Sequence, residues 1–281
     1  MPGPLRRAGL QLRAAQRLIR RGRAPLRTRL GPLDDRLVFV LGSPRSGTTF
    51  LGNSIGSLPG FIDLGEVAPL KAAVPELSQR SPEEAAPELR ALLAHTRRLG
   101  LAGSLRPVEQ TPEAVFVAPA LAIGFPEGRF IHIVRDGRDV VCSLLERGWL
   151  SAEREGVDDA GRAYGSQARF WVEPERRNEF EAAGDARRAA WAWRRYVTAA
   201  RELGERTLEI HYERLTERPD EVASAIARFL AVSPEPLVAA LQAARSTSVG
   251  RWQNDLSAEQ LADVEEEAGA LLAELGYLRS S

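Results

Sequence analysis

The chain has 281 residues and a formal net charge of zero, from 38 basic and 38 acidic side chains. This length permits one large α/β domain or two small ones, and the charge balance argues against a nucleic-acid partner. No apolar run is long enough to span a bilayer, and the single cysteine, Cys142, excludes an intrachain disulfide. A reducing compartment, the cytoplasm, is therefore expected.

Residues 1–33 are expected to form a basic arm ahead of a single domain, residues 34–281. The first 30 residues hold nine arginines and no acid. Four apolar residues recur every seven positions: Leu5, Leu12, Ile19 and Leu26. The arm is either a solvated, poorly ordered segment or a basic amphipathic helix in peripheral contact with the inner face of a membrane. It lacks the continuous apolar core of a secretory signal.

A phosphate-binding loop is predicted after the first strand. Residues 37–41 are apolar, and the segment Gly42-Ser-Pro-Arg-Ser-Gly-Thr-Thr49 leads into a helix that starts at Thr48. The N–H groups of such a loop and of the following helix N-terminus bind anions. In an ATP-binding loop the residue after Gly47 would be lysine, but here it is Thr48, and the cation is Arg45. The pattern indicates a nucleotide phosphate and argues against ATP with magnesium.

Strands and helices alternate along the rest of the chain. Helix starts are indicated at Ser81, Thr111, Pro219 and Ser257, further helices over 140–145 and 189–203, and strands over 130–134 and 207–211. This alternation predicts a three-layer α/β fold, in which helices flank a mostly parallel central sheet. Residues 151–185 are rich in charge and glycine. They form either a mobile acceptor-side lid or a surface insertion pinned to the core by its aromatic side chains.

A second anion-binding segment follows the strand Phe130–Val134. It reads Arg135-Asp-Gly-Arg-Asp139 and continues into a helix that carries Ser143 and Arg147 one turn apart on one face. Because ligands bind at the carboxyl ends of parallel strands, Arg135 is placed where a second phosphate would lie. Arg138 and Asp139 are interpreted as an ion pair or as caps of the helix start. A nucleotide with phosphates on both its 5′ and 3′ sides would need two such segments.

At these residues the chain resembles the sulfotransferases that use 3′-phosphoadenosine 5′-phosphosulfate, and most of all the bacterial and tyrosylprotein-type branch. The resemblance implies the P-loop-like sulfotransferase fold, this donor, no metal, and a hydroxyl-bearing acceptor. It implies that Arg45, Ser46, Gly47, Thr48 and Thr49 bind the 5′-phosphosulfate. It further implies that the rest of the donor is bound by Arg135, Ser143, Arg147, Tyr212, Ser248, Gly250 and Arg251.

The same resemblance supplies a candidate base, Glu66, in a Gly-Glu context 21 residues after Arg45. A carboxylate beside the donor can accept the hydroxyl proton. The alternative for Glu66 is an exposed loop acid. A histidine base is the competing idea, but His95, His132 and His211 all fall in predicted helix or strand segments and are interpreted as structural.

Position 110 departs from the family pattern. The bacterial relatives commonly read Glu-Lys-Thr-Pro where this chain has Glu109-Gln-Thr-Pro112, so Gln110 replaces a lysine that assists the leaving group. An amide donates a hydrogen bond but brings no positive charge. The only lysine, Lys71, is placed elsewhere in the sequence.

Two other classes remain open on the sequence. A P-loop kinase or ATPase would need lysine at position 48 and an aspartate at the end of the second strand, where Arg135 stands. A non-catalytic nucleotide-binding protein is suggested by Gln110 and the basic arm. The acceptor is equally open, with carbohydrate, lipid, peptide and secondary-metabolite hydroxyls as the candidates.

Overall fold

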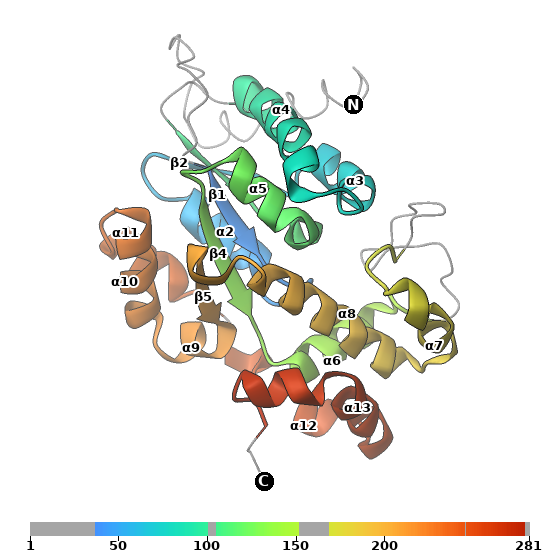
Figure 1. Ribbon diagram of the computed structural model, residues 1–281. Coiled ribbons are helices and arrows are strands. Elements are labelled where there is room, and N and C mark those ends of the chain that lie inside the picture. The colour runs from blue at the N-terminus through green and yellow to red at the C-terminus, as the bar shows by residue number, and fades with distance from the viewer. Residues whose placement is uncertain (1–36, 101–104, 152–168, 245, 279–281) are drawn as a thin grey trace.

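A computed structural model describes residues 37–100, 105–151, 169–244 and 246–278, without the side chains of residues 94–100. Its five strands form one parallel sheet in the order β2-β3-β1-β4-β5. Their bounds are β1 Val38–Leu41, β2 Phe61–Gly65, β3 Arg106–Glu109, β4 Arg129–Val134 and β5 Thr207–His211. This sheet confirms the predicted α/β class with a parallel central sheet (Figure 1).

Successive side chains of the central strands alternate between two buried faces, as the twofold period of a strand requires. Phe39 of β1 and Phe130 of β4 lie on one face, where their rings stack with centroids 4.9 Å apart. Val40 and Ile131 belong to the hydrophobic cluster on the other face. Both faces are therefore covered, which explains why these strands read as continuous apolar runs in the sequence.

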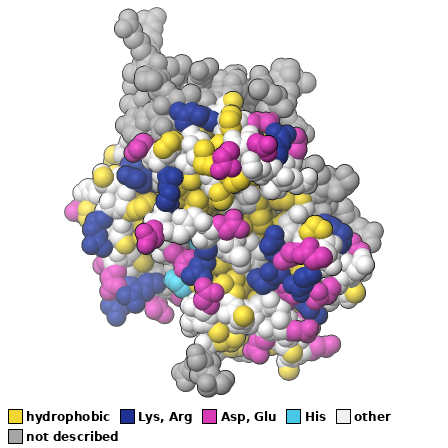
Figure 2. All heavy atoms as spheres, viewed as in Figure 1, with side chains coloured by type: hydrophobic (Ala, Val, Ile, Leu, Met, Phe, Trp, Pro, Cys, Tyr) yellow, Lys and Arg dark blue, Asp and Glu magenta, His cyan; other side chains and the backbone are white. Residues whose placement is uncertain are grey.

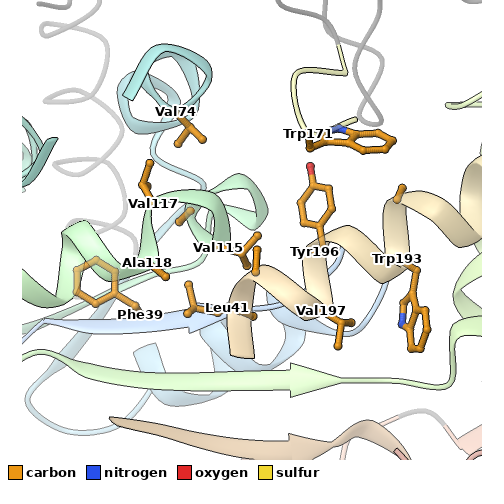
Figure 3. Close-up of a cluster of buried hydrophobic side chains, with 14 of the residues drawn as sticks. Phe39, Leu41, Val74, Val115, Val117, Ala118, Trp171, Trp193, Tyr196 and Val197 are labelled. Atoms are coloured by element: carbon orange, nitrogen blue, oxygen red, sulfur yellow. The ribbon is translucent and has the colours of Figure 1, made fainter. Parts of the chain in front are cut away.

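Helices cover the two faces and complete the three layers. The first face is packed against α3 Ala68–Leu77, α4 Pro82–Gly100, α5 Ala118–Gly124, α6 Gly137–Arg147, α8 Asp185–Arg201 and α13 Ala258–Glu274. Figure 3 shows this core where Leu41 of β1 lies under Val115 and beside Val197 of α8. The second face is packed against α2 Thr48–Gly56, α9 Tyr212–Glu217, α10 Pro219–Leu230 and α11 Glu235–Leu241.

Two of the predicted helix starts carry the expected caps, whereas no described side chain caps the helices that begin at Pro112 and Pro219. At α4, the Glu84 N–H donates to the Ser81 hydroxyl and the Ser81 N–H donates to the Glu84 carboxylate, both at 3.3 Å. Ser257 and Gln260 form the same reciprocal pair at α13. The helix expected from Thr111 begins as a 3₁₀ helix, Pro112–Val117, and continues as α5.

Strands β2 and β3 were not predicted. β2 reads Phe-Ile-Asp-Leu-Gly, and β3 reads Arg-Pro-Val-Glu with a proline inside it, so neither gives an apolar run of normal strand length. They form one edge of the sheet, where β3 pairs with β1 and β2 pairs with β3. Pairing with neighbouring strands decides their conformation. Glu66 directly follows β2 and Gln110 directly follows β3, so both residues lie at the carboxyl edge of the parallel sheet.

The described part of the 151–185 segment is pinned to the core. The rings of Trp171 and Phe180 are buried and meet edge to face, with centroids 5.5 Å apart. Phe170 meets Phe116 in the same way at 5.2 Å. The remaining elements near it are the 3₁₀ helix Pro174–Arg176 and α7 Arg177–Ala182. The interpretation as an insertion pinned by aromatics fits these residues, whereas 152–168 lie outside the described residues, as does the basic arm.

Charged side chains of both signs interleave over α7, α8 and α13, on the right of Figure 2. Arg176, for example, pairs with Glu267 at 2.9 Å, and Arg194 pairs with the same carboxylate at 2.8 Å. Through these ion pairs with Glu267, the network links α13 to α8. Among the described helices, none combines the length and apolar character needed to cross a membrane.

Candidate donor-binding site

The loop between β1 and α2 has the backbone shape of an anion cradle. Arg45 adopts a left-handed conformation with φ of 72°, and Gly47 has φ of 98°. A Cβ atom at Gly47 would lie 2.8 Å from the Tyr212 ring, so only glycine fits between the loop and this side chain. The sequence Gly-x-x-x-x-Gly therefore reflects a close packing requirement as well as the turn itself.

The N-terminus of α2 is open toward this loop. Gly47 is its N-cap, and no described side chain caps the helix. The first N–H groups of a helix have no partner within it, and the helix dipole adds positive character there. Ser46 is fully buried, and its hydroxyl lacks a hydrogen-bond partner among the described residues. These donors fit an anionic group such as a phosphate.

Two predicted phosphate-binding segments meet at this loop. The Arg45 Nε donates a hydrogen bond of 2.9 Å to the Ser143 hydroxyl on α6. Arg135, at the end of β4, donates from Nη1 to the backbone carbonyl of Arg45 at 3.2 Å. Residues 90 or more positions apart are thus in direct contact. A shared site, with Arg45 and Arg135 side by side, is the arrangement that the sequence required.

Positive charge accumulates at this contact. The pKa of Arg45 is lowered from its ordinary value, first by burial and then by repulsion from Arg147 and Arg135. Arg45 and Arg147 also share Trp149, with guanidinium carbons 5.8 and 5.9 Å from its ring centroid. Three guanidinium groups that repel one another are stabilised by an anion placed between them. The electrostatics therefore favour a phosphate-bearing ligand.

Arg135 is held in place by buried neighbours. The indole N–H of Trp193 donates to its carbonyl at 3.0 Å, and Gly137 packs against the same indole, leaving no room for a Cβ. The Tyr212 ring lies 5.0 Å from its guanidinium carbon. Arg135 is 6% exposed, and its Nε lacks a hydrogen-bond partner among the described residues. A buried guanidinium N–H with no acceptor fits an incoming anion.

The segment 246–252 closes over Arg135. The Arg135 side chain donates from Nη2 to the Ser248 carbonyl. The two carboxylate oxygens of Asp139 accept hydrogen bonds from the N–H groups of Gly250 at 2.8 Å and Trp252 at 3.1 Å. Ser248 and Gly250 therefore lie next to Arg135 and Asp139. The Arg251 side chain instead forms ion pairs with Glu146 and with Asp255 of α12 Trp252–Asp255.

Asp139 has a different role from the one inferred from sequence. Arg138 pairs with Asp136 at 2.7 Å, and Asp136 caps α6 by accepting from the Arg138 N–H. Asp139 neither pairs with Arg138 nor caps the helix start, because its fully buried carboxylate holds the 246–252 segment. Its pKa is raised by burial. No local sequence signal indicates a partner more than 100 positions away.

Glu66 lies at the start of α3, beside the only lysine of the chain. Its side chain is 41% exposed, and its Oε2 lies 3.5 Å from the Nζ of Lys71. Lys71 is buried and pairs with Glu113 at 2.6 Å. Helix α3 thus places Lys71 beside the candidate base, a contact that was not predicted from the sequence.

Gln110 is buried against α2. Its Oε1 lies 2.7 Å from where a Cβ on Gly52 would be, so α2 and the end of β3 are in close contact. Its Nε2 donates to the Asp63 Oδ1 at 3.2 Å. Position 110 is thus next to the helix whose N-terminus faces the anion loop. The Gln110 amide, directly after β3, therefore contacts both Asp63 of β2 and Gly52 of α2.

The histidines have structural surroundings where they are described. His132 is fully buried and its Nδ1 lies 3.1 Å from Glu209. His211 Nδ1 lies 2.9 Å from the Tyr277 hydroxyl. The side chain of His95 lies outside the described residues. A surface hollow of about 700 Å³ lies beside His132 and Glu209, and Arg45, Arg135 and Arg147 are not among its lining residues.

The parallel sheet and the glycine-bounded loop between β1 and α2 define an α/β protein whose first loop has the shape of an anion cradle. The sulfotransferase family model matches residues 85–236, more than half of the chain. The chain belongs to the sulfotransferase family. None of the curated proteins matches it in sequence.

Solved sulfotransferase structures share the fold. A sulfotransferase domain from the curacin biosynthetic pathway has a TM-score of 0.55 at 14% identity, covering 87% of this chain and 98% of that one. A domain from the olefin synthase of Synechococcus PCC 7002 has a TM-score of 0.52 at 18% identity, with 87% and 95% covered. Mouse sulfotransferase SULT7A1, complexed with PAP, has a TM-score of 0.53 at 14% identity, with 87% and 88% covered.

Proposed function

We propose that the protein transfers a sulfuryl group from 3′-phosphoadenosine 5′-phosphosulfate to a hydroxyl group of an acceptor. The observation that carries this proposal is the contact of Arg45 with Ser143 and Arg135, which joins two anion-binding segments in one site. A nucleotide with phosphate groups at both ends matches two adjacent clusters of groups that donate hydrogen bonds. That a mouse relative of the same fold binds PAP supports this choice of nucleotide.

The residues divide into groups by their position. Arg45, Ser46 and the N–H groups of Gly47, Thr48 and Thr49 would bind the 5′-phosphosulfate. Arg135, Ser143 and Arg147 would bind the 3′-phosphate, with Tyr212, Ser248 and Gly250 closing over it. Arg251 would reach the nucleotide only after leaving Glu146 and Asp255, so its proposed role here is to fasten the closing segment.

Glu66 is the proposed base. As the acceptor oxygen forms its bond to sulfur, its proton passes to the Glu66 carboxylate, and the bond from sulfur to the bridging oxygen breaks. The electron pair of that bond stays on the 5′-phosphate, which leaves as adenosine 3′,5′-bisphosphate. Arg45 and the N-terminus of α2 would stabilise the charge that grows on this phosphate. Gln110 would contribute a hydrogen bond without charge.

A thermal-shift experiment tests the donor assignment. Adenosine 3′,5′-bisphosphate should raise the melting temperature because it binds the folded protein alone, whereas ATP with magnesium should not. The reverse result would favour a kinase or ATPase. Incubation with radiolabelled donor and a panel of carbohydrate, lipid, peptide and small-molecule hydroxyls then tests transfer. Binding of the bisphosphate without transfer to any acceptor would favour a non-catalytic nucleotide-binding protein.

A further inference from the structure

The proposed base, Glu66, lies beside one lysine and two further acidic side chains, Glu109 and Glu113. Lys71 is 2% exposed, and burying an unpaired ammonium group would cost several kcal/mol. Glu113, also buried, offsets this cost with an oxygen 2.6 Å from the Nζ. The Nζ retains a second carboxylate neighbour, Glu66, at 3.5 Å on the side that faces solvent. The ammonium group thus bridges an interior carboxylate and the candidate base.

A third carboxyl group, that of Glu109, belongs to the same short segment as Glu113. Glu109 is fully buried, and desolvation raises its pKa to about 8. Its Oε1 accepts a hydrogen bond of 2.7 Å from the Thr111 N–H. Burial thus favours the protonated form of Glu109, whereas Glu66 and Glu113 form ion pairs with Lys71.

The backbone beside Glu66 is held by the same segment of chain. The Val67 N–H donates to the Thr111 hydroxyl at 2.8 Å. Residues at alternate positions, Glu109, Thr111 and Glu113, thus fasten the turn that carries Glu66, whereas Gln110 between them contacts Asp63 and α2. One short segment after β3 serves both the proposed base and the helix that opens on the anion loop.

We propose that Lys71 is a positioning residue, which holds the Glu66 carboxylate in the orientation that the transfer requires. This inference rests on the proposed function. A side chain that is 41% exposed samples several rotamers unless a partner restrains it, and misplacing a reacting group by about 1 Å can cost up to about a hundredfold in rate. Lys71, itself fixed by Glu113, restrains Glu66 without contacting the substrate.

The variant must remove both buried charges together. Lys71→Met alone would leave the Glu113 charge buried without its ammonium, and the protein could fail to fold. Lys71→Met combined with Glu113→Gln replaces the pair by neutral groups of similar shape, a change that folds tolerate far better. The matched control is Glu76→Gln. Glu76 lies on α3, as Lys71 does, and its exposed carboxylate pairs with Arg80.

Kinetics separate positioning from a merely structural role. The combined variant should lower kcat about tenfold, with KM for the donor unchanged, whereas Glu76→Gln should retain most of kcat. In a Glu66→Gln background the combined change should cause no further loss, because its effect passes through Glu66. Wild-type kcat in the combined variant, or an equal loss in both backgrounds, would overturn the inference.

The single lysine also allows a test that needs no turnover. Protein grown with ¹³C,¹⁵N-lysine has one labelled lysine side chain, and the resonances of its ammonium end should shift in Glu66→Gln but not in Glu76→Gln. Unchanged chemical shifts in Glu66→Gln would show that the Lys71 ammonium group does not interact with Glu66, and would overturn the inference. Failure of the proposed function would appear separately, as absence of any stabilisation of the wild type by adenosine 3′,5′-bisphosphate.

Discussion

The guanidinium group of Arg135 donates to the backbone carbonyl of Arg45 at 3.2 Å, so the turn after β4 holds the loop after β1. The same loop carries the Arg45 side chain to Ser143 on α6. A ligand bound at one segment would therefore lie close to the other. This coupling is the basis of the predictions for the donor site.

Replacing Arg45 by alanine should abolish measurable stabilisation by adenosine 3′,5′-bisphosphate, because a charge-assisted contact to a phosphate is lost. The ligand-free protein should be at least as stable as the wild type, since repulsion from Arg147 and Arg135 is relieved. Differential scanning fluorimetry with and without ligand measures both. Arg80→Ala, at an exposed ion pair, is the control. Wild-type affinity in Arg45→Ala would contradict the loop assignment.

Replacing Glu66 by glutamine should leave the affinity for the bisphosphate near that of the wild type. Turnover on a competent acceptor should fall by about two orders of magnitude, the usual contribution of a positioned base. Isothermal titration and a radiolabelled transfer assay separate the two effects. Equal turnover in both proteins would place the base elsewhere.

Replacing Gln110 by lysine should raise turnover, because an ammonium group beside α2 would stabilise the leaving phosphate. Asp63, whose Oδ1 lies 3.2 Å from the Gln110 amide nitrogen, would offset the buried charge. Gln110→Met serves as the neutral comparison of similar length. The prediction fails if the lysine variant binds the bisphosphate normally and gains no rate.

Replacing Asp139 by alanine should weaken binding of the bisphosphate about tenfold, because the N–H groups of Gly250 and Trp252 lose their acceptor and the closing segment loosens. Affinity for a nucleotide that lacks the 3′-phosphate should change much less. Titration with adenosine 3′,5′-bisphosphate and with adenosine 5′-phosphosulfate makes the comparison. Equal losses for both ligands would argue against a role on the 3′ side.

Replacing Glu109 by glutamine should change how stability depends on pH. Burial raises the folded-state pKa of Glu109 from its ordinary 4.5 to about 8, so the folded protein binds a proton that the unfolded chain releases between these values. Wild-type stability should therefore fall as pH rises from about 4.5 to 8, by on the order of 3–5 kcal/mol from this group. Urea unfolding should show a flatter profile in the variant. Parallel profiles would refute the assignment.

Much of this architecture was predictable because its signals are local. β1 and β4 are apolar runs that end in glycine or arginine, and the caps at Ser81 and Ser257 lie within one turn of their partners. β2, β3 and the Asp139 contacts were missed because their partners are distant in sequence. The contacts of Lys71 with Glu66 and Glu113 were missed for the same reason, since only the packing of α3 brings these side chains together.

The sequence by itself determined the elements whose backbone requirements are satisfied within a few residues: the glycine-bounded loop, the helix starts and the alternation that makes a parallel sheet. It also specified arginine, and not lysine, as the cation of this loop. Only the tertiary structure decided which charges meet, because β1 and β4 lie side by side through sheet pairing and α3 packs against the 3₁₀ helix Pro112–Val117. Coulombic and hydrogen-bonding contacts depend on distance in space, which residue spacing along the chain does not specify.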